Sequence, residues 1–413
     1  GCGYRKAVDF DSSLVADVID HRVAEMQLPV YTVQPIWVQC RIPQSAVPGT
    51  YKGELLVSEG EVVLHRLSLE IQVSERVLPE PSKWAYHLDL WQNPYAVARY
   101  YQVPLWSEEH LDAMRPWMKR ADGSWLFDYT IFDRWVEFMQ SVGIDKQINC
   151  YSMVPWKLSF RYYDQATDSF QSLECAPGDA VYEEFWITML RSFSRHLREK
   201  GWFERTAIAM DERPMEVMRK TLKVIRAADP DFKVSLAGNY HPEIEKDLYD
   251  YCIAINQRFP DEVRDRRIAE GKPTTYYTCC SEAHPNTFTF SDPAEAVWLS
   301  YYSAKDQLDG YLRWAYNSWP LESLLDSRFR TWAAGDTYLV YPGARSSIRF
   351  ERLIEGIQAH EKIRILRREF TESGNRSGLK RIERLLAPFQ LGSMPEVPAA
   401  VTVNKANELL NKL

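Results

Sequence analysis

The stretch Thr206-Ala-Ile-Ala-Met-Asp-Glu-Arg-Pro214 decides the fold of this chain. Ala207 to Met210 is typical of a short buried strand, and two adjacent carboxylates, Asp211 and Glu212, follow it directly. Pro214 then opens an amphipathic helix, because its fixed φ and missing N–H suit a first helical turn. Charged residues at the carboxyl end of a buried strand are typical of α/β barrels, which place their chemistry there. An Asp-Glu pair is also a common helix cap, so the surrounding sequence must decide.

Strands and helices alternate on both sides of this stretch, from Lys83 to Tyr316. Further strands are expected at 84–90, 144–151, 232–237, 251–255, 274–279 and 310–316, and an eighth within the hairpin-like segment 156–174. Helices are expected near 107–118, 128–142, 179–200, 215–228, 242–247 and 293–305, and in a charged segment ending at Glu270. This order favours a (β/α)8 TIM-like barrel over an open doubly wound sheet, since the chain has no glycine-rich phosphate loop.

The regions outside the barrel have their own patterns. Alternating segments at 30–42, 48–57 and 64–73 predict antiparallel strands of a β-sandwich, although they are too few for the ~7 strands of a complete one. We therefore expect a truncated sandwich domain at 1–80, with a proline-rich linker at its end, and the catalytic barrel at 81–335. A carboxyl-terminal appendage at 336–413 is expected to hold a strand at 337–343, a long helix at 346–367 and a helix near 380–386.

The composition excludes some classes of function. The chain has 413 residues, and its 50 basic and 57 acidic side chains are interspersed, so that no basic stripe favours a nucleic-acid partner. No apolar run approaches the ~20 residues that span a bilayer. The 14 Trp and 23 Tyr favour a carbohydrate ligand, because aromatic rings stack on sugars, or else a large aromatic core. Seven scattered cysteines show no disulfide framework, although one bridge is allowed.

Polar and aromatic residues follow nearly every expected strand. They are Asp89, Trp91, Asn149, Tyr151, Asn239, Tyr240, His241, Asn256, Glu282, His284, Trp314, Tyr316, Asn317 and Trp319. Amides and carboxylates bind sugar hydroxyls, and rings cover their C–H faces, so this set predicts a sugar-binding cleft. It holds no Ser-His-Asp pattern. The segment Cys279-Cys280-Ser-Glu-Ala-His284 lacks the spacing of a zinc site, so neither a metal nor another cofactor is expected.

The adjacency of Asp211 and Glu212 favours one mechanism. Consecutive residues leaving a strand point in different directions, so each carboxylate can reach a different part of one ligand. Glycosidases that use two separate carboxylates hold them on different strands, roughly 5–9.5 Å apart. An adjacent pair fits better the mechanism in which the 2-acetamido oxygen of the substrate attacks the anomeric carbon. Asp211 would then orient the acetamido group, and Glu212 would be the general acid and then the base.

Several motifs in combination resemble glycoside hydrolase family 123. They are the β-sandwich lead, the Met-Asp-Glu-Arg-Pro turn at 210–214, Trp314-Ala-Tyr-Asn-Ser-Trp319 and Gly335-Asp-Thr-Tyr-Leu-Val-Tyr-Pro-Gly343. The carboxyl-terminal region also resembles domain of unknown function 4091. The resemblance implies a retaining exo-β-N-acetylgalactosaminidase that acts on glycosphingolipid-type or related glycans. It also implies a bacterial protein located in the periplasm or outside the cell, although this chain shows no signal peptide.

The resemblance extends to the site residues. Asp211 matches the residue that orients the acetamido group, and Glu212 matches the acid/base. The sugar pocket is then expected to contain Trp314, Tyr316, Asn317 and Trp319, with Asp336 and Tyr338 from the following loop and Asn149, Tyr151, Asn239 and Tyr240 from other strand ends. We expect an exo-β-N-acetylhexosaminidase with GalNAc favoured, whose partner is a glycan ending in a β-linked N-acetylhexosamine. Two alternatives remain: a glycosidase pairing one of these carboxylates with Glu282 or Asp89, and a carbohydrate-binding protein without catalysis.

Overall fold

The computed structural model describes residues 15–102, 117–328 and 332–413. These residues divide into two compact units, of which Ile19–Trp84 form the smaller and the rest of the described chain forms the larger. Most of the helix expected near 107–118 lies outside the described residues. Its last two positions belong instead to a strand, β5 (Trp117–Lys119).

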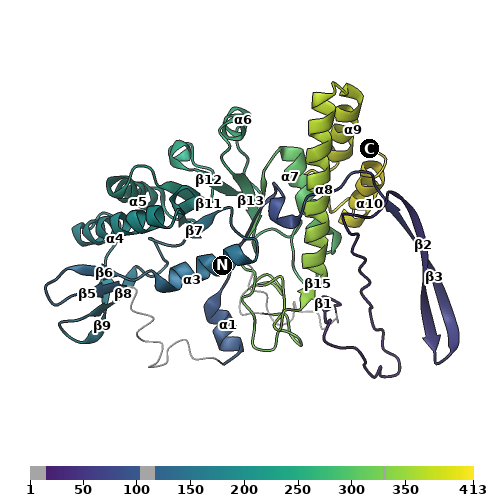
Figure 1. The fold of residues 1–413 in the computed structure, drawn as a ribbon, viewed down its shortest axis with the longest axis horizontal. Coiled ribbons are helices and arrows are strands. Elements are labelled where there is room, and N and C mark those ends of the chain that lie inside the picture. The colour runs from purple at the N-terminus through teal and green to yellow at the C-terminus, as the bar shows by residue number, and fades with distance from the viewer. Residues whose placement is uncertain (1–14, 103–116, 329–331) are drawn as a thin grey trace. The chain divides into compact units, whose positions relative to one another are not determined.

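The centre of the larger unit is a curled sheet of seven parallel strands (Figure 1). The strand order is β4-β14-β13-β12-β11-β10-β7. The strands are β4 (His87–Leu90), β7 (Ile148–Cys150), β10 (Thr206–Met210), β11 (Lys233–Gly238), β12 (Asp250–Ala254), β13 (Thr274–Thr278) and β14 (Gly310–Arg313). All six pairings between neighbours are parallel. The chain is thus a mixed α/β protein with a TIM-like half-barrel, as the alternation of strands and helices predicts.

Burial along the strands explains why these segments form the sheet. Every residue of β10 is buried, which is why its sequence after Thr206 is a continuous apolar run. Along β12, Cys252 and Ala254 join a cluster inside the curl, whereas the ring of Tyr251 packs against Phe259. Glycine is needed at Gly310, because a Cβ there would lie 1.9 Å from the carbonyl oxygen of His87 on β4.

The eighth barrel strand expected within 156–174 is not formed there. That segment makes the hairpin of β8 (Ser159–Asp164) and β9 (Ser169–Glu174), in a separate sheet with β5 and β6 (Trp125–Phe127). Phe160 and Tyr163 of β8 are buried and Arg161 is exposed, so this strand is not buried throughout as β10 is. Within the described residues the edge strands β7 and β4 are joined by a side-chain hydrogen bond instead, from Asn149 Nδ2 to Asp89 Oδ2 at 3.1 Å.

Helices connect the strands of the larger unit. They are α1 (Pro94–Tyr100), α3 (Thr130–Ser141), α4 (Ala180–Glu199), α5 (Met215–Ala228), α6 (Asp261–Ala269) and α7 (Ala294–Asp306), with short 3-10 turns η3 (Phe203–Arg205) and η4 (Glu245–Asp247). The structure confirms the predicted helices at 128–142, 179–200, 215–228 and 293–305 with small shifts of their ends. In place of the one expected near 242–247 it has only the turn η4.

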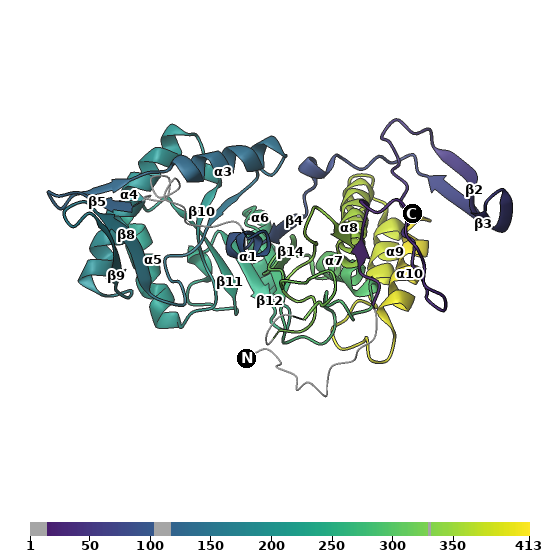
Figure 2. The same ribbon diagram turned by 90° about the horizontal axis from the view of Figure 1, so that it is seen from below.

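Three more helices form the carboxyl-terminal part. α8 (Ile348–Glu372), α9 (Arg376–Leu386) and α10 (Ala399–Leu410) lie side by side next to α7 (Figure 2). The long helix and the shorter one after it were predicted. The third helix, α10, is not predicted; it begins after Pro398 and buries Val403, Ala406 and Leu410. Glycines and prolines in the segment before α10 interrupt the helical pattern, so its apolar spacing does not stand out in the sequence of the tail.

The prediction of a strand at 337–343 is wrong. This segment forms turns, with isolated bridges from Asn317 to Tyr338 and from Tyr341 to Arg345. The buried guanidinium of Arg349 accounts for this, because its Nη1 binds the carbonyl oxygens of Gly335 (2.9 Å) and Tyr338 (2.8 Å). Short β1 (Val18–Ile19) and β15 (Ser346–Ser347) pair nearby.

The smaller unit contains one antiparallel hairpin. β2 (Gly49–Glu59) pairs with β3 (Val62–Val73), and the short 3-10 turn η2 (Pro81–Lys83) follows. The third expected strand, at 30–42, has no regular structure. Its apolar side chains are exposed, as at Val33 and Ile36, and in the described chain no neighbouring strand pairs with it. The sandwich and the domain boundaries at 80 and 335 therefore stay predictions.

Candidate active site

The carboxyl ends of the seven parallel strands meet at one edge of the curled sheet. Asp211 follows β10, Tyr151 follows β7 and Trp91 follows β4. Trp314 follows β14, and Cys279 follows β13. Because the carboxyl ends of parallel strands lie at one edge of the sheet, residues that are far apart in sequence meet there, as expected for an α/β barrel.

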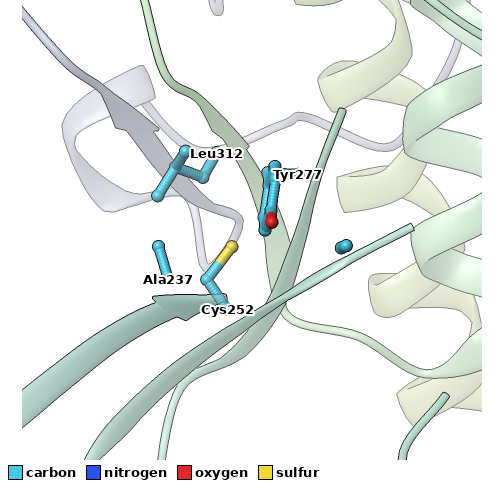
Figure 3. Packing of buried hydrophobic residues seen from close by; sticks show 5 residues of the cluster. Ala237, Cys252, Tyr277 and Leu312 are labelled. Carbon is cyan, nitrogen blue, oxygen red and sulfur yellow. The ribbon is translucent and has the colours of Figure 1, made fainter. Parts of the chain in front are cut away.

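Apolar side chains fill the inside of the curl below this edge. Ala237, Cys252, Ala254, Tyr277 and Leu312 form a buried cluster contributed by four neighbouring strands (Figure 3). The partly buried side chains packed against it are Trp91, Cys279 and Trp314. The cluster closes the interior of the sheet, so that a ligand at the strand ends would rest on a floor of aromatic rings.

Asp211 is half enclosed and lies beside a guanidinium. Its side chain is 24% exposed, and its Oδ1 lies 2.8 Å from Nη1 of Arg213. Burial raises the pKa of Asp211, and the positive charge of Arg213 opposes that rise. This environment suits a carboxylate that aligns a polar group of a ligand while it remains in contact with a fixed cation.

Glu212 points toward other strands. The phenolic hydroxyl of Tyr277, on β13, donates a hydrogen bond to Glu212 Oε1. Gly238, at the end of β11, packs against the stem of Glu212, because a Cβ at Gly238 would lie 3.5 Å from Glu212 Cγ. Burial, and then the bond to Glu212, raise the pKa of Tyr277 far above its usual range, so this hydroxyl stays a donor. The carboxylate of Glu212 is therefore exposed but oriented.

Arg213 connects the carboxylate pair to the loop after β7. Its Nε donates to the carbonyl oxygen of Val154 at 2.8 Å, and its Nη1 donates to the carbonyl oxygen of Glu212 at 2.7 Å. Its Cζ lies 3.9 Å from the centre of the Trp156 ring. Only 7% of the Arg213 side chain is exposed, so its position is well defined.

A polar network lies beneath the aromatic floor. Asp89 Oδ2 accepts hydrogen bonds from Trp91 Nε1 (3.2 Å) and from Asn149 Nδ2 (3.1 Å). Burial raises the pKa of Asp89, against the lowering effect of His87. Burial alone would lower the pKa of His87, but its bond to Asp250 and the surrounding carboxylates raise it.

Two rings of this region face the strand ends. The rings of Trp91 and Tyr151 are 4.6 Å apart, and Tyr151 remains partly exposed. Burial and the negative charges of Asp89, Asp250 and Asp211 raise the pKa of Tyr151. Because β7 pairs with β10, the structure brings two of the predicted binding residues, Asn149 and Tyr151, to the same part of the sheet edge as the carboxylate pair.

Three of the binding residues predicted after β14, namely Trp314, Tyr316 and Asn317, have different surroundings. Trp314 lies against the floor, and its buried indole N–H has no hydrogen-bond partner among the described residues. Tyr316 is partly buried, with its ring 5.9 Å from that of Phe350. Asn317 has a structural bond, because its Oδ1 accepts the backbone N–H of Asn93 at the start of α1.

Other predicted pocket residues are buried in the protein. Trp319 and Tyr338 form a core cluster with Tyr341, and Trp319 Nε1 donates to the carbonyl oxygen of Val340. Asp336 is fully buried and lies 2.5 Å from Arg313 Nη2. All three side chains are buried at the loop after β14. Their contacts stabilise that loop, and their role in sugar binding stays a prediction.

The loop after β11 is also held by structural contacts. The hydroxyl of Tyr251 donates to the carbonyl oxygen of Asn239 and accepts the N–H of His241. The ring of Tyr240 packs against Tyr251 and Phe259, on the face of β12 that points away from the interior cluster. The predicted pocket role of Tyr240 is therefore not supported by its position. The side chain of Asn239 is exposed.

Two family models match this chain. The catalytic-domain model of glycoside hydrolase 123 matches residues 91–121 and 112–366, and the model of the glycoside hydrolase 123 N-terminal domain matches residues 1–59. The chain belongs to glycoside hydrolase family 123. It is therefore an enzyme that hydrolyses glycosidic bonds, and the resemblance inferred from the motifs is confirmed at the level of the family.

Solved structures agree with this assignment. A family 123 glycoside hydrolase from Clostridium perfringens, described in connection with glycolipid glycan hydrolysis, is 26% identical, with a TM-score of 0.76 over 90% of this chain and 76% of that chain. A glucosidase from Croceicoccus marinus, 13% identical over 57% of this chain and 54% of that chain, has a TM-score of only 0.35, too low to support an argument. Curated proteins gave no match.

Glu282 and Asp89, the alternative catalytic carboxylates of this family 123 enzyme, already accept hydrogen bonds from neighbouring residues. Glu282 Oε2 accepts the backbone N–H of Cys279 at 2.8 Å, and its Oε1 accepts the Ser281 hydroxyl at 2.5 Å. The ring nitrogen Nδ1 of His284 lies 3.0 Å from Glu295 Oε1.

In the described part of the chain no group of three or more His, Cys, Asp or Glu side chains is arranged to hold a metal ion. No helix among those residues is long and apolar enough to cross a membrane.

Three residues at this site, Arg213, Trp156 and Tyr277, are not predicted from the sequence. Arg213 lies in the stretch that carries the two carboxylates, and Trp156 lies in the segment expected to form a hairpin. Tyr277 lies inside a predicted strand, next to Tyr276, and periodicity places the two rings on opposite faces without saying which faces inward. A clearer signal exists for Arg213, because a guanidinium two residues after a carboxylate lies within reach of it.

Proposed function

We propose that this enzyme is a retaining exo-β-N-acetylhexosaminidase that uses the 2-acetamido group of its substrate as the nucleophile, with GalNAc as the favoured sugar. The observation that carries the proposal is the arrangement of the adjacent carboxylates. Asp211 lies toward Arg213 and the loop after β7, whereas Glu212 lies toward Gly238 and Tyr277. Two carboxylates that face different neighbours suit two different tasks on one substrate.

The first step proceeds without an enzyme nucleophile. Asp211 accepts the acetamido N–H and so aligns the acetamido carbonyl oxygen with the anomeric carbon. That oxygen forms a bond to the anomeric carbon as the glycosidic bond breaks, and Glu212 gives its proton to the departing oxygen. The product of this step is an oxazolinium ion, whose positive charge the carboxylate of Asp211 stabilises.

The second step reverses the roles. Glu212, now a carboxylate, takes a proton from a water molecule whose oxygen attacks the anomeric carbon. The bond to the acetamido oxygen breaks, and the sugar leaves with its original anomeric configuration because that carbon has been inverted twice. Arg213 keeps Asp211 ionised through both steps, and Tyr277 holds Glu212 in place.

The environment of the other carboxylates supports this mechanism over a pair on separate strands. Glu282 accepts two hydrogen bonds within its own loop, and Asp89 Oδ2 is shared by Trp91 and Asn149. These hydrogen bonds hold both side chains toward their own neighbours, whereas Asp211 and Glu212 leave the same strand end next to each other. Glycolipid-type glycans are a reasonable substrate class, because the C. perfringens relative is described in connection with glycolipid glycan hydrolysis.

Hydrolysis of p-nitrophenyl β-GalNAc, β-GlcNAc and β-Gal tests the proposal. We expect activity on the two acetamido sugars, higher on GalNAc, and none on β-Gal. A GalNAc-thiazoline, which mimics the oxazoline, is expected to inhibit strongly, because the enzyme binds the intermediate more tightly than the substrate. Activity on β-Gal would contradict the acetamido mechanism, and inactivity on every glycoside would favour a binding protein.

A variant assigns the acid. Glu212→Gln is expected to lose most activity on glycosides with poor leaving groups, which need a proton, and much less on a dinitrophenyl glycoside, which does not. Wild-type rates on both substrates would show that Glu212 is not the acid.

A further inference from the structure

We propose that Trp156 is the stacking platform for the leaving-group sugar, the residue of the glycan next to the bond that is cut. The inference rests on the proposed function and adds to it a second binding subsite, which takes the pyranose ring of the aglycone. It starts from the exposure of Trp156, which is 82%. A large aromatic side chain so exposed contributes little to the core and is available to a ligand.

The position of this ring is fixed by the protein. Val154 and Met153, two and three residues earlier, are buried, and the carbonyl oxygen of Met153 accepts the Tyr182 hydroxyl at 2.8 Å. The N–H of Val154 donates to the Ser152 hydroxyl at 3.0 Å. Trp156 therefore projects from an anchored segment. A ring held in this way loses little conformational entropy on binding.

One guanidinium joins this ring to the catalytic pair. The Cζ of Arg213 lies 3.9 Å from the centre of the Trp156 ring, and its Nη1 lies 2.8 Å from Asp211 Oδ1. The same nitrogen donates to the backbone carbonyl of Glu212. The cation–π contact occupies one face of the indole and orients the ring beside the strand end that carries both carboxylates. Its exposure shows that the remaining surface is open.

The exposure decides which part of the substrate the ring meets. The terminal sugar must be enclosed for catalysis, and the partly buried rings of Trp91 and Trp314 pack against the floor where it would rest, with Tyr151 beside Trp91. Trp156 is far more exposed than these. In an exo-acting enzyme the rest of the glycan leaves through the mouth of the site, so an exposed ring beside the catalytic pair meets the leaving-group sugar.

Chemistry favours a sugar as the occupant. A pyranose presents a face of C–H bonds that stacks on an indole, while its hydroxyls stay in contact with water. No buried polar partner is needed, and a ring whose other face lies on Arg213 offers none. The contact is expected to tolerate several pyranoses and to add affinity for glycans over simple glycosides.

Substrates of different size test the proposal. Trp156→Ala is expected to lower kcat/KM for the methyl glycoside of a β-GalNAc-galactose disaccharide about fivefold to tenfold, which corresponds to the usual strength of one aromatic contact. Trp156→Phe is expected to keep most of the rate. For β-GalNAc fluoride, whose leaving group is too small to reach the ring, and for inhibition by the thiazoline, both variants are expected to match the wild type.

A matched control and three outcomes complete the test. Trp135→Ala removes another exposed tryptophan, on α3, and is expected to change neither substrate. Equal losses for the disaccharide and the fluoride, or weaker thiazoline binding, would place Trp156 in the terminal-sugar pocket and overturn the proposal. Unchanged kinetics on the disaccharide would also overturn it. If the wild type hydrolysed neither substrate, this result would contradict the proposed function, and with it the inference that rests on that function.

Discussion

Replacing Tyr277 by Phe tests whether this hydroxyl orients the general acid. The phenol is 6% exposed and donates to Glu212 Oε1, and Phe removes the donor without changing the packing of the ring. A hydrogen bond to a charged group contributes about 1.5–3 kcal/mol. Because Glu212 is exposed, water replaces part of that bond, and the lower end of the range applies. About 1.4 kcal/mol in the transition state corresponds to a tenfold loss of rate.

The loss should depend on the leaving group. A glycoside with a poor leaving group needs the proton of Glu212, so we expect kcat/KM to fall about tenfold in Tyr277→Phe. A dinitrophenyl glycoside leaves without that proton, so its rate should change little. In the Glu212→Gln background the same substitution should have almost no further effect, because Gln has no proton to transfer and the tyrosine then has no acid to orient.

Tyr276→Phe is the matched control for this prediction. Tyr276 is the preceding residue of β13, is equally buried, and donates its hydroxyl to the carbonyl oxygen of Leu299 at 2.6 Å, away from the site. It should lower stability without any dependence on the leaving group. An equal loss on good and poor leaving groups in Tyr277→Phe, or additive effects with Glu212→Gln, would refute the orienting role.

Two further predictions concern pH. Arg213 opposes the rise in the pKa of Asp211 caused by burial, so Arg213→Gln should raise that pKa further and move the acid limb of kcat/KM to higher pH, whereas Arg213→Lys should move it less; an unchanged limb in Arg213→Gln would contradict the role of Asp211 as an ionised group. Burial lowers the pKa of His360 from 6.5 to about 4. Below pH 6.5 this histidine therefore binds a proton in the unfolded chain, whereas in the folded chain it stays neutral until about pH 4. Stability conferred by the neutral histidine is thus present above pH 6.5 and is lost as the pH falls toward 4, by about 2 kcal/mol between pH 7 and pH 5. Urea unfolding at these two pH values should show a loss smaller by about that amount in His360→Leu, and equal losses in both proteins would show that another group is responsible.

The sequence predicts the sheet better than the loops, for a physical reason. Ala207–Met210 is apolar throughout because both faces of β10 are buried, and such runs identify parallel strands. Ser159–Asp164 mixes polar and apolar residues and, unlike β10, is not buried throughout. Its sequence therefore lacks the continuous apolar run of a buried parallel strand. The expectation of a barrel strand there followed from the eight strands of a complete barrel.

The pocket is less predictable, because contacts distant in sequence decide which loop residues face it. Trp319 and Tyr338 follow a strand end, as Trp314 does, yet they are buried together in the core. The carbonyl oxygens of this loop are held by Arg349, a residue of α8, and its carboxylate by Arg313. No local pattern announces such pairings. Strand-end position therefore identifies the edge at which the site lies, while orientation depends on the tertiary structure.

The stretch from Thr206 to Pro214 explains why the two carboxylates have separate surroundings. β10 has β7 on one side and β11 on the other, and consecutive residues leave a strand in different directions. Asp211 therefore meets Arg213, which is fastened to the loop after β7, and Glu212 meets Gly238 at the end of β11 and Tyr277 beyond it. A carboxylate pair on two separate strands would need two loops to hold its spacing. Here a single peptide bond sets the spacing, and the neighbouring strands supply a cation for one carboxylate and a hydrogen-bond donor for the other.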